Sequence, residues 1–237
     1  MEVHHHPHVE KKSFKEYLLE GLMIFLAVSM GFIAENVRES ITAHEKKKQY
    51  VESLIQDLKE DTVKINEGIE KNLARVSGLD SLLNYLKTFP YTDSSLNKIY
   101  QLRNHLRYRG EVFFTKRTLV QLKNSGGMQF IKNMAVSDSI VNYDEQNQSA
   151  ERQWEVSFNS IWQGRLIEFK IFDPRHDPAI PEKNRLLLND EKLLMEFYNW
   201  VFNTKFAFGN YVIRLQNHKK SAVELIQFLR KEYHIEE

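Results

Sequence analysis

Hydrophobic and polar positions divide the chain into a polar tail, one charge-free run and a long body with helical periodicity. The run, residues 21–34, reads GLMIFLAVSMGFIA and contains no proline. At 1.5 Å per residue it rises about 21 Å, short of a hydrocarbon core of roughly 30 Å. Extending it back to residue 17 restores most of the length and includes Glu20, a carboxylate that can snorkel or find a partner near a helix end. This pattern predicts a transmembrane anchor over residues 17–35.

Three other interpretations of the run are weaker. A buried core helix of this length is one alternative, but the nearly unbroken apolar run lacks the polar stripe that a surface helix shows. Cleavage as a signal peptide near Ala27 would leave too short an apolar region before it, and Phe32 spoils a later site at Ala34. An interfacial helix needs a charged face within the segment. The pattern therefore favours a single-pass anchor.

The orientation of this anchor follows less directly from charge. Lysines at positions 11, 12 and 15 precede it, whereas Arg38 and three lysines at positions 46–48 follow it, so the positive-inside count is nearly balanced. A short N-terminal tail makes N-inside the simpler topology. We therefore expect insertion in the cell inner membrane with the body on the periplasmic side.

One face of the predicted anchor combines small and acidic residues. Helical offsets bring Glu20, Ala27, Gly31 and Glu35 to the same side, and Ala27 and Gly31 form a small-xxx-small pair that allows close helix approach. One hypothesis is a partner-binding membrane helix, with Glu20 buried against a cation or a second carboxyl. Another places both glutamates among headgroups, and a third makes Glu20 a proton-linked carboxyl of a membrane complex.

The body begins with a heptad-like stripe that predicts a long helix continuing directly from the anchor. Leu54, Leu73 and Leu82 widen this stripe, which suits a multi-helix bundle better than a two-stranded coiled coil. The stripe consists of Val51, Ile55, Leu58, Ile65, Ile69, Val76, Leu79, Leu83 and Leu86, with Thr62 and Asn72 in the two positions that break the series.

Shorter elements follow this first helix. Residues 89–94 read as a turn with Asp93 or Ser94 as the next N-cap, followed by a helix up to Leu106. Residues 111–114 are the one stretch that resembles a strand. A short helix over residues 115–123 then ends at Asn124-Ser125-Gly126-Gly127, which reads as a glycine stop or, more weakly, as an anion-binding loop.

Two more long helices complete the predicted body. The first, residues 134–172, has a predicted buried side marked by Ile140, Trp154, Phe158, Ile161, Leu166 and Phe169. After a proline-rich loop comes the most regular helix, with Phe197, Val201, Thr204, Phe208, Tyr211, Leu215, His218, Ala222, Leu225 and Leu229 spaced by four and three. The prediction is thus an all-α fold: a polar tail (1–16), an anchor (17–35) and an up-and-down bundle of about four long helices (36–237).

Composition excludes some classes of function. Lys plus Arg (33) nearly balances Asp plus Glu (32), so no overall field would attract nucleic acid. Cysteine is absent, which excludes disulfides, thiolate metal sites and cysteine nucleophiles. No metalloprotease HExxH, serine-hydrolase elbow, dinucleotide fingerprint or kinase motif set occurs. The sequence gives no reason to expect an enzyme.

The tail contains the clearest candidate metal ligands, His4, His5, His6 and His8, interrupted by Pro7. Their imidazoles can bind a divalent metal, although such a tract also resembles an expression tag or an opportunistic binder.

A second polar group lies in the proline-rich loop: Asp173, Arg175, His176 and Asp177. These could bind a metal or exchange protons, but turn-forming aspartates in a solvated loop explain them better. The tryptophans, Trp154, Trp162 and Trp200, fall at core spacings, which favours packing over an aromatic ligand pocket.

The leader HHHPHVEKKSFKEYLLEGLMIFLAVSMGFIAENVRE, with LVQLKNSGG and AVSDSIVNYD further on, resembles a family of small single-pass membrane proteins of Bacteroidota-type bacteria. The resemblance covers most of the chain and implies that the histidines are native. That family brings no activity, ligand or catalytic residue to transfer.

Three hypotheses for function follow. The leading one is a structural or interaction subunit of an envelope assembly, binding the bilayer and either a second copy or another membrane protein. A ligand-sensing bundle that signals through a partner, and a proton- or metal-linked subunit of a membrane complex, are the alternatives.

Overall fold

The computed structural model describes residues 13–107, 110–173, 175 and 184–236. Contacts divide the chain into two units, residues 1–49 and 50–237, and helix α1 (Phe14–Leu86) contributes to both. Within the described ranges there is no β-strand, only an isolated bridge between Phe172 and Leu186. The predicted all-α class and the long helix at the anchor are confirmed, while residues 111–114 are extended without joining a sheet.

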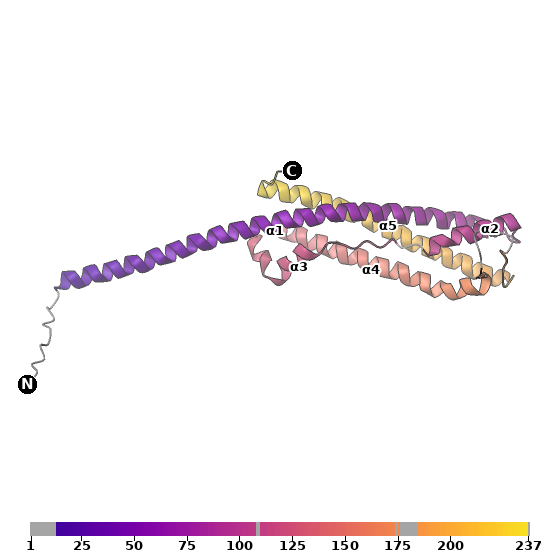
Figure 1. Cartoon of the computed structure of the whole chain (residues 1–237), viewed down its shortest axis with the longest axis horizontal. Helices are drawn as coiled ribbons and strands as arrows, with labels where there is room; N and C mark the ends of the chain where they lie inside the picture. The colour runs from indigo at the N-terminus through magenta and orange to yellow at the C-terminus, as the bar shows by residue number, and fades with distance from the viewer. Residues whose placement is uncertain (1–12, 108–109, 174, 176–183, 237) are drawn as a thin grey trace, which may run out of the picture. The chain divides into compact units, whose positions relative to one another are not determined.

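The second unit consists of four segments that alternate in direction. The first is α1 from residue 50 onward. The third and fourth are α4 (Met134–Ile171) and α5 (Glu191–Tyr233), which run alongside each other (Figure 1). The second segment is not one helix. It consists of α2 (Asp93–Leu102), the 3-10 helix η1 (Arg103–Leu106), an extended stretch and α3 (Arg117–Asn124). A further 3-10 turn, η2 (Gly127–Phe130), leads into α4.

Three core clusters show that this order is up and down. One cluster joins residues 51–58 of α1 to the start of α4 and the end of α5, with α3 against them. Another joins residues 79–86 of α1 to the end of α4 and the start of α5, with α2 and η1. The third lies between them and includes Val112 and Phe114. The up-and-down topology is therefore as predicted, although one of the four segments consists of short elements.

Helical periodicity correctly identified the buried faces of α1 and α5. All ten residues of the predicted α5 stripe, Phe197 to Leu229, are buried. On α1 the stripe is buried from Val51 to Leu86 except for the half-buried Thr62 and Val76, and Leu54 and Leu82 extend it. Leu73, predicted to widen the stripe, is 47% exposed. It lies on the solvent side because Asn72 and Arg75 take the neighbouring inward positions.

The predicted buried side of α4 is partly wrong. Ile140, Trp154 and Ile161 are buried, but Phe158, Leu166 and Phe169 are exposed, as is Trp162. The inward positions are taken instead by Ser157, Gly164 and Glu168. A small residue is needed at position 164 because the ring of Trp200 on α5 fills the space where a side chain would be. An acidic one suits position 168 because it pairs with buried Arg103 of η1.

Capping explains where the helices begin and end. The N-cap of α2 is Thr92, whose hydroxyl accepts from the backbone N–H of Ser95, so the predicted caps Asp93 and Ser94 were one or two residues late. α3 ends at Asn124 with Ser125 as its C-cap, and Gly126 follows with φ +70°, the left-handed conformation that favours glycine. This confirms the glycine stop.

Candidate functional site

The apolar segment of α1 is exposed within its own unit. An 18-residue window of this helix is apolar enough to cross a membrane, and none of it is buried. Eleven large apolar side chains are between 49% and 69% exposed: Leu18, Leu19, Leu22, Met23, Ile24, Phe25, Leu26, Val28, Met30, Phe32 and Ile33. The anchor predicted from the sequence is therefore a continuous helix without a protein environment in the described chain.

The predicted packing residues of the anchor all lie on this helix. Glu20, Ala27, Gly31 and Glu35 are exposed, and a methyl group added at Gly31 would meet no atom within 4 Å. Glu35 accepts from Arg38, with 2.9 Å from Nε to Oε2. This local ion pair partly neutralises the acidic end of the face. The small-residue pair leaves room for a second helix, and whether one binds there stays a prediction.

The structure describes only part of the two polar clusters predicted from the sequence. His4, His5, His6 and His8 lie outside the described residues, as do His176 and Asp177. Asp173 is described and buried: it accepts from the backbone N–H and guanidinium of Arg175, and Arg185 lies 3.6 Å away. Its hydrogen bonds with Arg175 lower the pKa of Asp173 well below its usual range. Asp173 thus holds the backbone and side chain of Arg175, and it is buried rather than solvated.

A metal centre is not apparent in the described part of the chain. Residues 13–107, 110–173, 175 and 184–236 contain no group of three or more His, Asp or Glu side chains arranged to hold an ion. The predicted metal tract in the tail stays a prediction.

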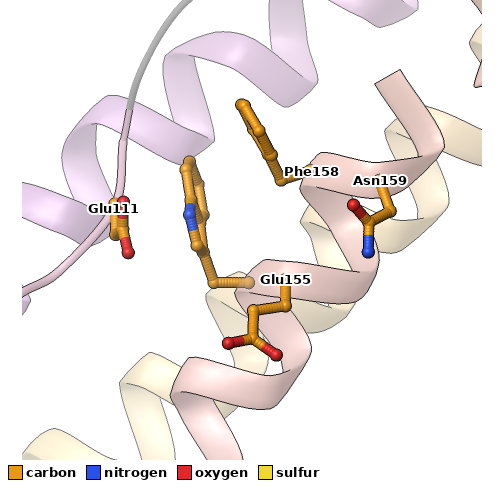
Figure 2. Close-up of a pocket in the computed structure, with 5 residues that line it drawn as sticks. Glu111, Glu155, Phe158 and Asn159 are labelled. Carbon is orange, nitrogen blue, oxygen red and sulfur yellow. The ribbon is translucent and has the colours of Figure 1, made fainter. Parts of the chain in front are cut away.

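The bundle carries a half-open pocket between α4 and the extended segment, with a volume of about 510 Å³. Figure 2 shows Glu155, Phe158 and Asn159 on one helix, α4, and Glu111 on the extended segment beside it. Trp154 also lines the pocket. Two carboxylates and two aromatic rings therefore surround one cavity, which the sequence did not indicate because Glu111 and Glu155 are 44 positions apart.

Trp154 separates this pocket from a buried cation. The guanidinium carbon of Arg75 lies 4.0 Å from the ring centroid of Phe208 and 5.9 Å from that of Trp154. Arg75 is only 1% exposed. The aromatic side chains thus supply part of its environment through cation–π contacts. They also show that the electron-rich rings at this site already interact with positive charge.

Buried polar side chains fix the extended segment that carries Glu111. The amide of Asn72 donates to the carbonyl oxygen of Gly110 at 2.7 Å, and the N–H of Val112 donates to the Tyr211 hydroxyl at 3.2 Å. Asp61 accepts from the N–H of Thr115 at 2.7 Å. An extended backbone without a sheet partner must find such partners when it is buried. These bonds hold the backbone on both sides of Glu111.

Another buried group links Asp61 to α5. The hydroxyl of Tyr143 donates to Asp61 at 2.7 Å, and the Tyr143 ring stacks on His218 with centroids 4.6 Å apart. Nε2 of His218 lies 2.6 Å from Oδ1 of Asn147. Burial raises the pKa of Asp61 and lowers that of His218 to about 4. His218 is therefore neutral at pH 7 and acts in packing, as its place in the predicted core stripe indicates.

The sequence reasoning did not single out Glu111 or Asp61, and it named Asn72 only as an interruption of the core stripe. The one available signal was a polar residue interrupting a core stripe, as Asn72 does. Such residues have partners that are distant in sequence, so periodicity shows that something polar is buried but not what it binds.

Comparisons with protein-family models, with curated proteins and with solved structures gave no match to this chain. The site must therefore be interpreted from its own geometry.

Proposed function

We propose that this chain is a membrane-anchored helical bundle that acts by binding other proteins, as a subunit of an assembly at the cell inner membrane. The exposed apolar helix supports this most strongly. Leaving a large aliphatic or aromatic side chain in water rather than burying it costs about 1.5–3 kcal/mol. For the eleven side chains of the segment this amounts to roughly 15–30 kcal/mol, more than the stability of a typical domain. A bilayer removes this cost.

Two surfaces support association with a partner. Ala27 and Gly31 offer a small-residue face to a second membrane helix. On the bundle, Trp162 and Leu166 of α4 are 56% and 71% exposed, and neighbouring exposed apolar side chains of this size are typical of binding surfaces. Under this proposal the N-terminal tail is cytoplasmic and the bundle periplasmic.

Fractionation of cells and extraction of their membranes test the anchor. We expect the protein to stay with the membranes after alkaline carbonate and to be released by mild detergent. A reporter enzyme that works only in the periplasm should be active when it is fused after residue 237. Release by carbonate alone would overturn the anchor, and a cytoplasmic reporter would reverse the orientation.

Association is tested by the native mass of the detergent-solubilised protein. We expect a dimer or larger complex that Ala27→Leu combined with Gly31→Leu reduces to the monomer mass. Ser29→Leu, which adds bulk on the opposite face of the helix, is the matched control and should leave the complex intact. A monomer without copurifying proteins would contradict the proposal.

A second candidate function is a ligand-responsive bundle. The pocket lined by Glu111 and α4 favours it, because cavities that combine aromatic walls with a few polar groups commonly bind small molecules.

A further inference from the structure

We propose that the solvent-facing side of α5 pairs with the same side of α5 in a second copy of this chain. This inference rests on the association proposed above, and it names the partner and the surface of the bundle that contacts it. The surface, called here the outer stripe of α5, consists of four apolar side chains: Met195, Phe202, Phe206 and Ile213. They are between 51% and 65% exposed, so packing within the bundle leaves more than half of each side chain in water.

The outer stripe has the spacing of a helix-pairing seam. With 3.6 residues per turn, its four side chains fall within a sector of about 40° on the side of α5 opposite the buried stripe from Phe197 to Leu229. Asn199 and Gly209 complete the series, which alternates steps of four and three from residue 195 to residue 213. A helix at the surface of a monomer is polar on the side that faces away from the core. This part of α5 is apolar on both sides, as is typical of a helix that is covered on both.

Charge is almost absent along this part of α5, which favours contact with an identical surface. Among residues 197–213 only Lys205 is charged, whereas residues 57–73 of α1, a stretch of the same length, contain eight charged residues. Lys205 forms an ion pair with Asp80 of α1. When two copies meet about a twofold axis, a charge near the axis lies close to the same charge of the other copy. The outer stripe avoids this repulsion.

A row of asparagines beside the outer stripe is also self-complementary. It consists of Asn199, Asn203, Asn210 and Asn217, whose side-chain amides make no hydrogen bond in the described part of the chain. Each amide has donors and an acceptor, so an asparagine can pair with the same residue of a second copy, and such pairs select the register of paired helices. A helix that lies on a bilayer instead carries Lys and Arg beside its apolar face. The asparagines therefore favour a protein partner over a lipid surface.

The area of this face suits a small interface between copies. An aromatic side chain buries about 200 Å² when it is fully covered, so the four side chains of the outer stripe expose roughly 400 Å² of apolar surface. The asparagines raise this to about 600 Å² per copy, or roughly 1,200 Å² for the pair, the lower limit for a stable interface. Two copies anchored in one membrane also have a high effective concentration, which favours a contact of this size.

Cross-linking of single cysteines in membranes tests the contact. The chain contains no cysteine, so Phe206→Cys and Ile213→Cys each introduce one thiol on the outer stripe. We expect a short bismaleimide reagent to join two copies of either variant and to give a band at twice the chain mass of 28.1 kDa. Lys98→Cys, at an exposed residue of α2, is the control and should give no such band. No band with either cysteine of the outer stripe, or a band of another mass, would overturn the proposal.

A charge introduced on the outer stripe tests the same contact without a reagent. Phe206→Glu should raise the dissociation constant of the dimer at least tenfold, because the new carboxylates of two copies approach each other. Mass photometry of the detergent-solubilised full chain over a dilution series measures this. Val63→Glu, the matched control at a 60% exposed side chain of α1, should change the constant less than twofold. Helical circular dichroism verifies that both variants fold.

The outcomes separate this inference from the association on which it rests. A dimer that Phe206→Glu leaves unchanged would place the contact in the anchor or elsewhere on the bundle, and it would refute the role of α5 alone. A wild-type protein that is monomeric in detergent and gives no cross-link in membranes would contradict both proposals.

Discussion

Acid should destabilise the bundle through one buried histidine, His218. Its ring lies between Tyr143 and Phe114, with centroids 4.6 and 5.0 Å away, and its Nε2 contacts Asn147. Burial lowers its pKa to about 4, whereas an unfolded chain would show about 6.5. The unfolded state therefore binds a proton more readily than the folded state does. His218 contributes fully to stability above pH 6.5, and this contribution is lost as the pH falls toward 4.

The magnitude follows from the difference in pKa. A separation of about 2.5 pKa units at 1.36 kcal/mol per unit corresponds to roughly 3 kcal/mol below pH 4. Most of this, about 2.5 kcal/mol, should be lost by pH 4.5. Asp61 works in the opposite direction, because its pKa is raised by burial and its protonation favours the folded state. A comparison of variants that all retain Asp61 removes this contribution.

The assay is the free energy of unfolding in urea, measured on the detergent-solubilised protein at pH 7.5 and 4.5. His218→Phe keeps a ring between Tyr143 and Phe114 but cannot bind a proton. We expect the wild type to lose about 2.5 kcal/mol more than this variant between the two pH values. His44→Gln, which changes an exposed histidine, is the control and should behave as the wild type. Identical pH dependence in wild type and His218→Phe would refute the reasoning.

Two substitutions on α4 test its inward positions. Glu168→Gln should lower the free energy of unfolding by about 3 kcal/mol, because it leaves the Arg103 guanidinium, 5% exposed, without its counter-charge at 2.7 Å; urea unfolding measures it. Gly164→Ala should cost about 1–3 kcal/mol, because the added methyl carbon would lie 1.9 Å from an atom of the Trp200 ring. The near-ultraviolet circular dichroism of the tryptophans should change with it.

Each of these substitutions has a control in the same bundle. Glu196→Gln removes an exposed carboxylate of α5 and should change stability by less than about 0.5 kcal/mol. Gly209→Ala adds a methyl where no atom lies within 4 Å and should stabilise the helix by up to about 1 kcal/mol. If Glu168→Gln were as stable as Glu196→Gln, the buried ion pair would be unimportant. If both glycine variants behaved alike, Gly164 would not mark a tight contact.

The sequence predicted α5 well because its contacts require only size and spacing. Its inward residues, from Phe197 to Leu229, are mostly large and apolar, and they repeat every three or four positions. On α4 the same reasoning selected Phe158, Leu166 and Phe169, which are exposed. The buried side there depends on close approach of Trp200 and on pairing with Arg103, and neither is visible from the hydrophobicity of α4 alone.

A related reason explains why the candidate pocket could not be predicted from the sequence. Its helical half, Trp154 to Asn159, looks like an ordinary stretch of an amphipathic helix. The pocket forms only because Glu111, on a segment without regular secondary structure, lies beside this stretch. That segment follows a path set by hydrogen bonds to Asp61, Asn72 and Tyr211, and local propensity carries no information about such distant partners.

The dependence of this segment on distant side chains also constrains the order of assembly. Residues 110–115 leave the ribosome soon after α1, yet the hydroxyl that pairs with Val112 belongs to Tyr211, 99 positions later. Contacts of such large sequence separation form late, after the loop-closure entropy has been overcome. Until α5 is synthesised, the N–H of Val112 therefore lacks its native partner. The extended segment can thus complete its buried hydrogen bonds only after the last helix is in place.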